Sequence, residues 1–153
     1  MRILLIGGSK SGKSTMGQRL TRAFAAGAPM YYWATMEPTD EEDLARIARH
    51  LKDREGWGFE TIDKTAPARA GEELLTVSRY PEHFICTCDD LWRGGGRFDE
   101  WTELYRAGLA QICRRLAAEF DVVCEMTAGV PHVWKCDAVA GMPHVWKGEL
   151  PDA

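Results

Sequence analysis

The chain has 153 residues, of which 45% are hydrophobic and 27% charged, a length and balance typical of one soluble globular domain. Its net charge of −4 argues against a nucleic-acid partner, and no apolar run approaches the roughly 20 residues that a membrane helix needs. An apolar strand pattern begins directly after Met1-Arg2, so we expect no signal peptide. The five cysteines are an odd number within apparent core elements, which favours reduced thiols and a cytoplasmic location.

Patterns typical of strands and helices alternate along the first 126 residues, which predicts a mainly parallel sheet covered on both faces. Thr39 or Asp40 is the expected N-cap of the second helix, which carries carboxylates in its first turn. The expected strands span residues 2–6, 30–35, 83–88 and 120–126, a short extended piece spans 56–63, and the expected helices span 13–26, 40–54, 66–79 and 99–119.

The end of the chain contains two near-identical octapeptides, AGVPHVWK at 128–135 and AGMPHVWK at 140–147. Two copies of this length are too few for a repeat fold, so we interpret them as a local duplication. Because Pro131 and Pro143 interrupt regular hydrogen bonding, we expect the tail not to form one regular element. The predicted units are a nucleotide-binding domain at 1–127 and a divergent tail at 128–153, which either belongs to the same domain or is an appended segment.

The segment GGSKSGKS follows the first expected strand and leads into the first expected helix. Its spacing is that of a Walker A motif, whose glycines turn successive backbone N–H groups toward phosphate oxygens. Lys13 can reach the outer phosphates of ATP or GTP, and the Ser14 hydroxyl can bind Mg²⁺. A glycine turn without a ligand is the alternative, but the strand–loop–helix context favours a P-loop NTPase-like three-layer α/β domain. The predicted phosphate-binding residues are Gly7, Gly8, Ser9, Lys10, Ser11, Gly12, Lys13 and Ser14.

An acid near the metal is expected at the end of a neighbouring strand. The strand at 83–88 is followed by Asp89 and Asp90, and either carboxylate could bind Mg²⁺ together with Ser14. The alternative is that both residues only cap the turn after the strand.

Four segments together resemble a known family: GGSKSGKS at 7–14, YYWATMEPTDEEDLARIARH at 31–50, the stretch from Trp57 to ETID at 60–63, and VVCEMTAGVP at 122–131. The resemblance is to the bifunctional adenosylcobinamide kinase/adenosylcobinamide-phosphate guanylyltransferase family of cobalamin biosynthesis. It is good over residues 1–63, thin over 64–126 and absent after 131.

The resemblance implies two reactions: phosphorylation of a hydroxyl of adenosylcobinamide, and transfer of GMP from GTP to that phosphate through a histidine. It places the guanylylated histidine at His50, at the end of RIARH. Thr87 stands where the family has an acidic residue at the end of its third strand. The further nucleotide-binding positions that it implies are Ala34, Thr35, Met36, Leu51, Lys52, Asp53, Arg54, Asp63 and Thr87.

The surroundings of His50 support this role independently, though less strongly. Arginine and lysine side chains flank it on the helix, and a neutral imidazole can attack a phosphorus atom while nearby cations steady a triphosphate. An ordinary exposed histidine on a charged helix face is the alternative.

The chain also departs from the family pattern. The N-E-V-G segment is reduced to Cys124-Glu125-Met126-Thr127, in which Glu125 keeps the place of the family glutamate. Family members continue with another helix and strand, and here the duplicated tail stands in their place. We therefore expect a shortened, divergent member.

Three further groups of residues carry weaker interpretations. The spacing of Cys124, His132, Cys136 and His144 matches no tight zinc knuckle, since paired ligands usually lie two to four residues apart. Cys86 and Cys88 share one face of a strand, where buried thiols are a simpler interpretation than a metal or a strained disulfide. Trp134 and Trp146 are candidates for covering the sheet edge or an oligomer contact.

The favoured function is the pair of transferase reactions above, with Mg²⁺, a nucleoside triphosphate and a corrinoid as ligands, no nucleic-acid or membrane partner, and a possible homo-oligomer. A P-loop kinase for another small alcohol is one alternative. A nucleotide-binding pseudoenzyme with a regulatory role is another.

Overall fold

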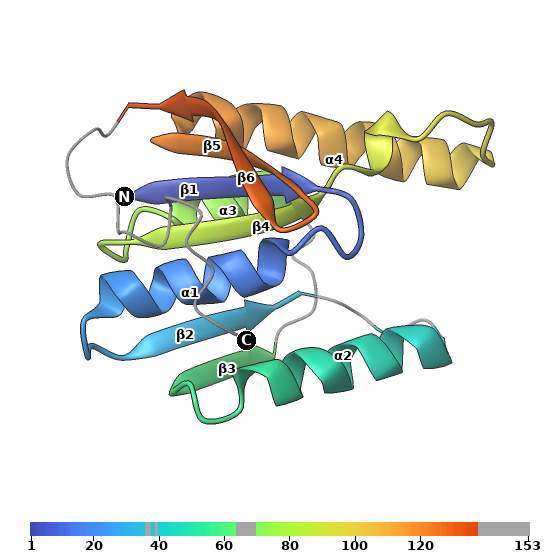
Figure 1. Cartoon of the computed structure of the whole chain (residues 1–153). Helices are drawn as coiled ribbons and strands as arrows, with labels where there is room; N and C mark the ends of the chain where they lie inside the picture. The colour runs from blue at the N-terminus through green and yellow to red at the C-terminus, as the bar shows by residue number, and fades with distance from the viewer. Residues whose placement is uncertain (36–37, 39, 64–69, 138–153) are drawn as a thin grey trace.

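A computed structural model describes residues 1–35, 38, 40–63 and 70–137, and strands alternate with helices along them (Figure 1). The α/β class and the mainly parallel sheet predicted from the sequence are confirmed. The elements are β1 (Arg2–Gly7), α1 (Lys13–Ala25), β2 (Met30–Ala34), α2 (Glu41–Arg54), β3 (Phe59–Asp63), α3 (Ala70–Val77), β4 (Phe84–Asp89), the 3₁₀ turn η1 (Leu91–Arg93), α4 (Glu100–Glu119), β5 (Val122–Thr127) and β6 (Val130–Cys136).

The main sheet has four strands in the order β4-β1-β5-β6. Strand β1 pairs in parallel with β4 on one side and with β5 on the other. The register joins Gly7 to Asp89 and Ile6 to Glu125, so the carboxyl ends of three strands meet at one edge. This edge is where open α/β sheets place their ligands.

Alternate side chains of β1 enter two hydrophobic clusters on opposite faces of the sheet. Ile3 and Leu5 pack with side chains of α1 and β5, whereas Leu4 packs with α3, α4 and the start of β5. All three side chains are fully buried. A near-continuous apolar strand is therefore explained by helices on both faces of the sheet.

Strands β2 and β3 pair in parallel with each other and form a second, two-stranded sheet. Within the described residues neither strand pairs with the main sheet, so the expectation of one sheet that includes them is wrong. Helix α1 lies between the two sheets (Figure 1): Gly17 faces β4, and the Arg22 guanidinium lies 5.4 Å from the centre of the Trp57 ring.

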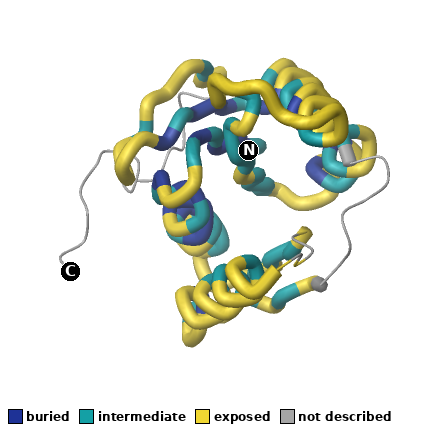
Figure 2. Tube along the Cα trace, turned by 90° about the vertical axis from the view of Figure 1, so that its right-hand side faces the viewer, coloured by how far each residue is buried: buried dark blue, intermediate teal, exposed yellow. Residues whose placement is uncertain are grey.

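Burial differs between the two sheets. The main sheet and its helices hold the buried hydrophobic core, whereas Arg54 is the one buried residue of α2. Figure 2 shows the same contrast, with dark blue concentrated around the main sheet and yellow covering much of α2 in the lower part of the view.

Most of the first octapeptide belongs to an antiparallel edge strand, β6, which includes Pro131 and which the sequence did not predict. An edge strand tolerates proline because one side of its backbone has no partner strand. Ala128 and Gly129 make the two-residue turn with φ of 50° and 81°, as a tight hairpin requires. The second octapeptide lies outside the described residues, and the boundary predicted at residue 127 stays a prediction.

Two helix N-caps follow directly from the sequence. The Asp40 carboxylate accepts a hydrogen bond from the Asp43 N–H at 2.8 Å, and Asp99 accepts one from the Thr102 N–H at 3.0 Å. Of the two residues proposed to cap the second helix, Asp40 is confirmed. No helix within the described ranges is long and apolar enough to cross a membrane.

Phe120→Ala should lower the free energy of unfolding by about 3–5 kcal/mol, because Phe120 is fully buried and meets the Phe84 ring edge-on at 6.0 Å. Urea denaturation measures the change. Trp101→Ala on α4 is the matched control: its side chain is 81% exposed, so the loss should stay within about 0.5 kcal/mol. Equal losses of unfolding free energy in the two variants would contradict the placement of Phe120 in the core.

Candidate nucleotide site

The loop after β1 has the backbone shape that a phosphate-binding loop needs. Gly12 has a φ of 90°, which L side chains rarely adopt, and it immediately precedes α1. A Cβ atom on Gly7 would lie 2.5 Å from the Met126 carbonyl oxygen, so only glycine fits between the loop and β5. The structure thus accounts for both glycines of the motif by local geometry.

Lys13 is 7% exposed, and its ammonium group has three partners. Nζ donates to the Gly8 carbonyl at 2.6 Å and to the Ser11 hydroxyl at 3.3 Å, and it lies 2.8 Å from Asp89 Oδ1. The cation is therefore already compensated, and an incoming phosphate has to replace one or more of these oxygens.

Asp89 ends β4 and Asp90 follows it, and the two carboxylates have different partners. Asp89 pairs with Lys13, whereas Asp90 Oδ2 lies 3.8 Å from Arg93 Nη1. Asp90 precedes η1 without a side-chain cap hydrogen bond, so for Asp90 the alternative that it caps the turn is wrong. The Asp90 N–H donates to the Gly7 carbonyl at 3.2 Å, which ties the end of β4 to the loop.

The donors available for Mg²⁺ are the Ser14 hydroxyl and these two carboxylates. All are oxygen ligands, which Mg²⁺ prefers, and they stand at the carboxyl edge of β4 and at the start of α1. The residues therefore fit the predicted ion in type and in place.

A second cation, Arg93, lies beside the same edge. Its guanidinium forms a bidentate ion pair with Glu125, in which Nη2 lies 3.4 Å from Oε2. The indole Nε1 of Trp134, on β6, donates to the same Glu125 oxygen at 3.0 Å. Arg93 and Trp134 together hold the pKa of Glu125 below its usual value, so this carboxylate is ionised.

Helix α2 reaches the phosphate loop through Arg46, whose Nη2 donates to the Ser9 hydroxyl at 3.4 Å. His50 follows four residues later, so the two side chains share one face of the helix. The imidazole Nδ1 is buried and has no hydrogen-bond partner within the described part of the chain. Partial burial lowers the pKa of His50; Asp53 opposes the shift, and the neighbouring arginines add to it.

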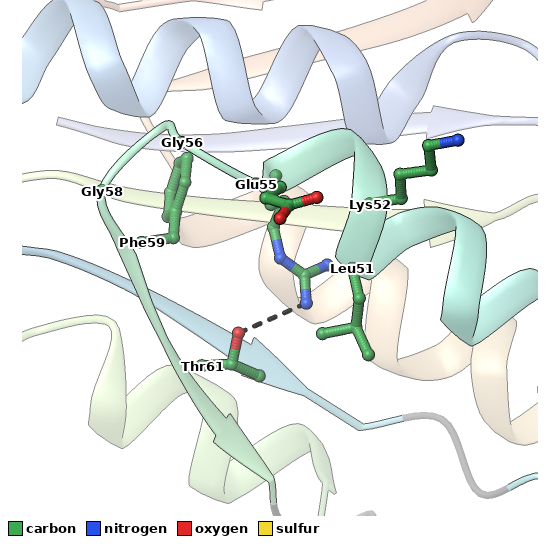
Figure 3. A pocket seen from close by; sticks show the side chains of 8 residues that line it. Leu51, Lys52, Glu55, Gly56, Gly58, Phe59 and Thr61 are labelled. Atoms are coloured by element: carbon green, nitrogen blue, oxygen red, sulfur yellow. Dashed lines mark hydrogen bonds between the residues drawn. The ribbon is translucent and has the colours of Figure 1, made fainter.

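A depression of about 680 Å³ lies between the end of α2 and β3, one helical turn beyond His50. Arg54 lines it, is 6% exposed, and has its guanidinium 3.7 Å from the centre of the Tyr32 ring. Arg54 Nη2 donates a hydrogen bond to the Thr61 hydroxyl at 3.3 Å. Figure 3 draws this hydrogen bond as a dashed line. Within the described residues, Arg54 Nε and Nη1 are buried and have no hydrogen-bond partner. The residues lining the depression are Leu51, Lys52, Arg54, Glu55, Gly56, Gly58, Phe59 and Thr61.

The remaining predicted nucleotide-binding residues lie on β4, on α2 and at the end of the β2–β3 sheet. Ala34 pairs with Asp63 at the carboxyl end of the β2–β3 sheet, and Thr35 follows Ala34. Thr87 is exposed on β4, two residues before Asp89, and faces Gly17 of α1. Lys52 and Asp53 are exposed on α2, and Met36 lies outside the described residues.

The five cysteines all lie within the described ranges, and none of them forms a disulfide. Burial raises the pKa of Cys86 to about 12 and that of Cys124 to about 11, which keeps both protonated. The described ranges contain no group of three or more histidine, cysteine, aspartate or glutamate side chains that could hold a metal ion, and His144 of the zinc alternative lies outside them.

Two features of the site were missed by the sequence analysis. No motif or spacing rule in the sequence pairs Arg93 with Glu125. Arg54 was named for its position in the family pattern, and no signal in the sequence showed that its guanidinium is buried. Both depend on contacts between elements that are distant in sequence.

Residues 3–71 match the family model described as cobinamide kinase / cobinamide phosphate guanyltransferase. The resemblance predicted from the sequence is confirmed over this part of the chain, which contains the phosphate loop, His50 and Arg54. A search of curated proteins found no match to the chain.

Asp89→Asn should raise the affinity for ATP in EDTA about threefold, because the amide no longer compensates the Lys13 charge. It should also remove most of the gain in affinity that Mg²⁺ brings, because a carboxylate ligand is lost. Calorimetric titrations with and without Mg²⁺ measure both effects. Glu119→Gln, which breaks the exposed pair with Arg79, is the control and should change neither. An Asp89→Asn variant indistinguishable from this control would argue against both roles.

Proposed function

We propose that this chain, whose residues 3–71 match the family described above, is a P-loop transferase that phosphorylates adenosylcobinamide and then transfers GMP to the product through His50. The observation that carries the proposal is the hydrogen bond from Arg46 to Ser9. It brings the helix of the predicted nucleophile against the loop of the predicted phosphate site.

The kinase step needs positioning and charge more than covalent help from the protein. The oxygen of the acceptor hydroxyl attacks the γ-phosphorus, the bond to the β–γ bridging oxygen breaks, and the nucleoside diphosphate leaves. The hydroxyl proton passes to a carboxylate or to water. Lys13 and the loop N–H groups stabilise the charge that develops on the phosphate oxygens. A bound Mg²⁺, held by Ser14 and Asp89 or Asp90, would add charge neutralisation at the outer phosphates.

The guanylyl step requires an unprotonated nitrogen on His50. That nitrogen attacks the α-phosphorus of GTP, pyrophosphate leaves, and the phosphate of the acceptor later displaces the imidazole from the same phosphorus. Because Nδ1 is buried, Nε2 is the nitrogen that we expect to attack. The lowered pKa of His50 keeps the ring neutral at physiological pH, as this role demands.

The depression beside Arg54 is the proposed place for the guanine base. Its two unpartnered donors suit the carbonyl oxygen and ring nitrogen of a purine, and the depression lies one helical turn from His50.

A nucleotide-binding pseudoenzyme is the second candidate. Thr87 favours it, because a neutral hydroxyl stands where the resemblance implies an acid. The labelling experiment below separates the two.

Mixing the protein with Mg²⁺ and GTP should add the mass of one GMP, and the adduct should be lost in acid and stable in base, as expected of a phosphoramidate. His50→Asn should abolish the adduct, because the amide cannot replace the imidazole nitrogen. His83→Asn is the matched control, since His83 stacks on Phe24 at the far end of β4 and should keep full labelling. Intact-protein mass spectrometry gives the result. An adduct that persists in His50→Asn would place the nucleophile elsewhere, and absence of an adduct in a wild type that binds GTP would favour the pseudoenzyme.

The acidic limb of the labelling rate should be centred below pH 6.5, because partial burial lowers the pKa of His50 from that ordinary value and only the neutral ring can attack. Asp53→Asn should move the acidic limb to still lower pH, since Asp53 opposes the shift. Initial rates between pH 5 and 8 test both statements. A limb centred above 6.5, or moved upward by Asp53→Asn, would contradict this environment for the ring.

A further inference from the structure

Arg93 stands at the rim of the phosphate loop without a role in the function proposed above. It ends η1, directly after β4, and its side chain is 51% exposed while its carboxylate partners Asp90 and Glu125 are 18% and 19% exposed. Exposed ion pairs contribute little to stability, so the fold alone does not account for a cation held between two acids.

Both partners belong to segments that touch the loop. Asp90 Oδ1 would lie 3.7 Å from a Cβ on Gly8. Glu125 lies on β5, and in the hairpin turn that follows this strand the Gly129 N–H donates to the Ser11 carbonyl at 3.0 Å. Both segments that hold the Arg93 guanidinium therefore contact the phosphate loop, and one of them also carries Asp89, the partner of Lys13.

The backbone that carries Arg93 is held in place by Arg106 of α4. This guanidinium is buried and donates to the carbonyls of Leu91, Trp92 and Gly94 at 2.9, 3.3 and 2.5 Å. It also pairs with Glu103 at 3.1 Å. The turn on both sides of Arg93 is thus fixed, while the Arg93 side chain itself remains accessible.

We propose that Arg93 is a second phosphate-binding cation. When a nucleoside triphosphate binds, the Arg93 guanidinium breaks its ion pairs with Glu125 and Asp90 and binds the outermost phosphate. A planar guanidinium binds phosphate oxygens in the same bidentate manner as the carboxylate it leaves. In the absence of nucleotide, Glu125 compensates the charge and Trp134 fixes the carboxylate. The inference rests on the proposed nucleotide site and assigns a ligand to a residue that the function above does not use.

Arg93→Gln should weaken the affinity for Mg·ATP about tenfold and that for Mg·ADP less than twofold, because the contact is to the terminal phosphate. Titration calorimetry with both nucleotides, and with GTP and GDP in parallel, measures the selectivity. Arg93→Lys should give an intermediate loss, since it keeps the charge without the bidentate geometry. Arg79→Gln is the matched control, because it removes an exposed cation paired with Glu119 far from the loop, and it should change neither affinity.

Glu125→Gln provides a test in the opposite direction. If Glu125 competes with phosphate for Arg93, the amide should strengthen Mg·ATP binding about threefold, and this gain should vanish in the Arg93→Gln background. A role in folding alone would make neither single variant bind ATP more tightly. Thermal melts of all variants identify any that fail to fold.

Equal losses for ATP and ADP in Arg93→Gln, or no loss at all, would overturn the inference. A gain from Glu125→Gln that persists without Arg93 would also overturn it, because it would be a general charge effect. A wild type that binds none of the four nucleotides would overturn the proposed function and this inference together. A wild type that binds GTP and labels His50, with Arg93→Gln unchanged, would overturn only the inference.

Discussion

The pairing of β1 between β4 and β5, with both of its faces buried, is the constraint on which the rest of the structure depends. It brings the carboxyl ends of three strands to one edge. The loop after β1 then starts beside Asp89 and Glu125, which arrive from strands distant in sequence. The hydrophobic packing of one short strand thus positions charged groups that share no local motif.

Charge compensation dominates that edge. Lys13 is paired with Asp89, and Arg93 with Glu125 and Asp90. The pair with Asp89 keeps the buried Lys13 ammonium from being an isolated charge, which would be costly. In the proposed function, a triphosphate would replace the carboxylate partners of both cations, and a bound Mg²⁺ would become the new partner of those carboxylates. Metal binding and nucleotide binding would then be coupled.

Much of the fold could be predicted because its signals are local. The apolar run of β1, the glycines of the loop and the cap at Asp40 each act within a few residues. The separate β2–β3 sheet could not be predicted, because periodicity identifies strands but not their partners. Strand β6 was missed because Pro131 argues against a strand unless the strand lies at an edge, and edge position is a property of the whole sheet. In the site, Lys13 and Asp89 follow from a motif and a strand end, whereas Arg93 and Glu125 meet through tertiary contacts alone.

The account requires that GGSKSGKS hold the phosphates of a nucleotide and that Lys13 contact them. Calorimetric titration of the wild type and of Lys13→Ala with Mg·GTP, combined with thermal melts, tests this most directly. The account predicts clear binding by the wild type, at least a hundredfold weaker binding by the variant, and a similar melt for both, since the loss concerns a charged contact to the ligand. Equal affinity of the two proteins, with native melts, would contradict it.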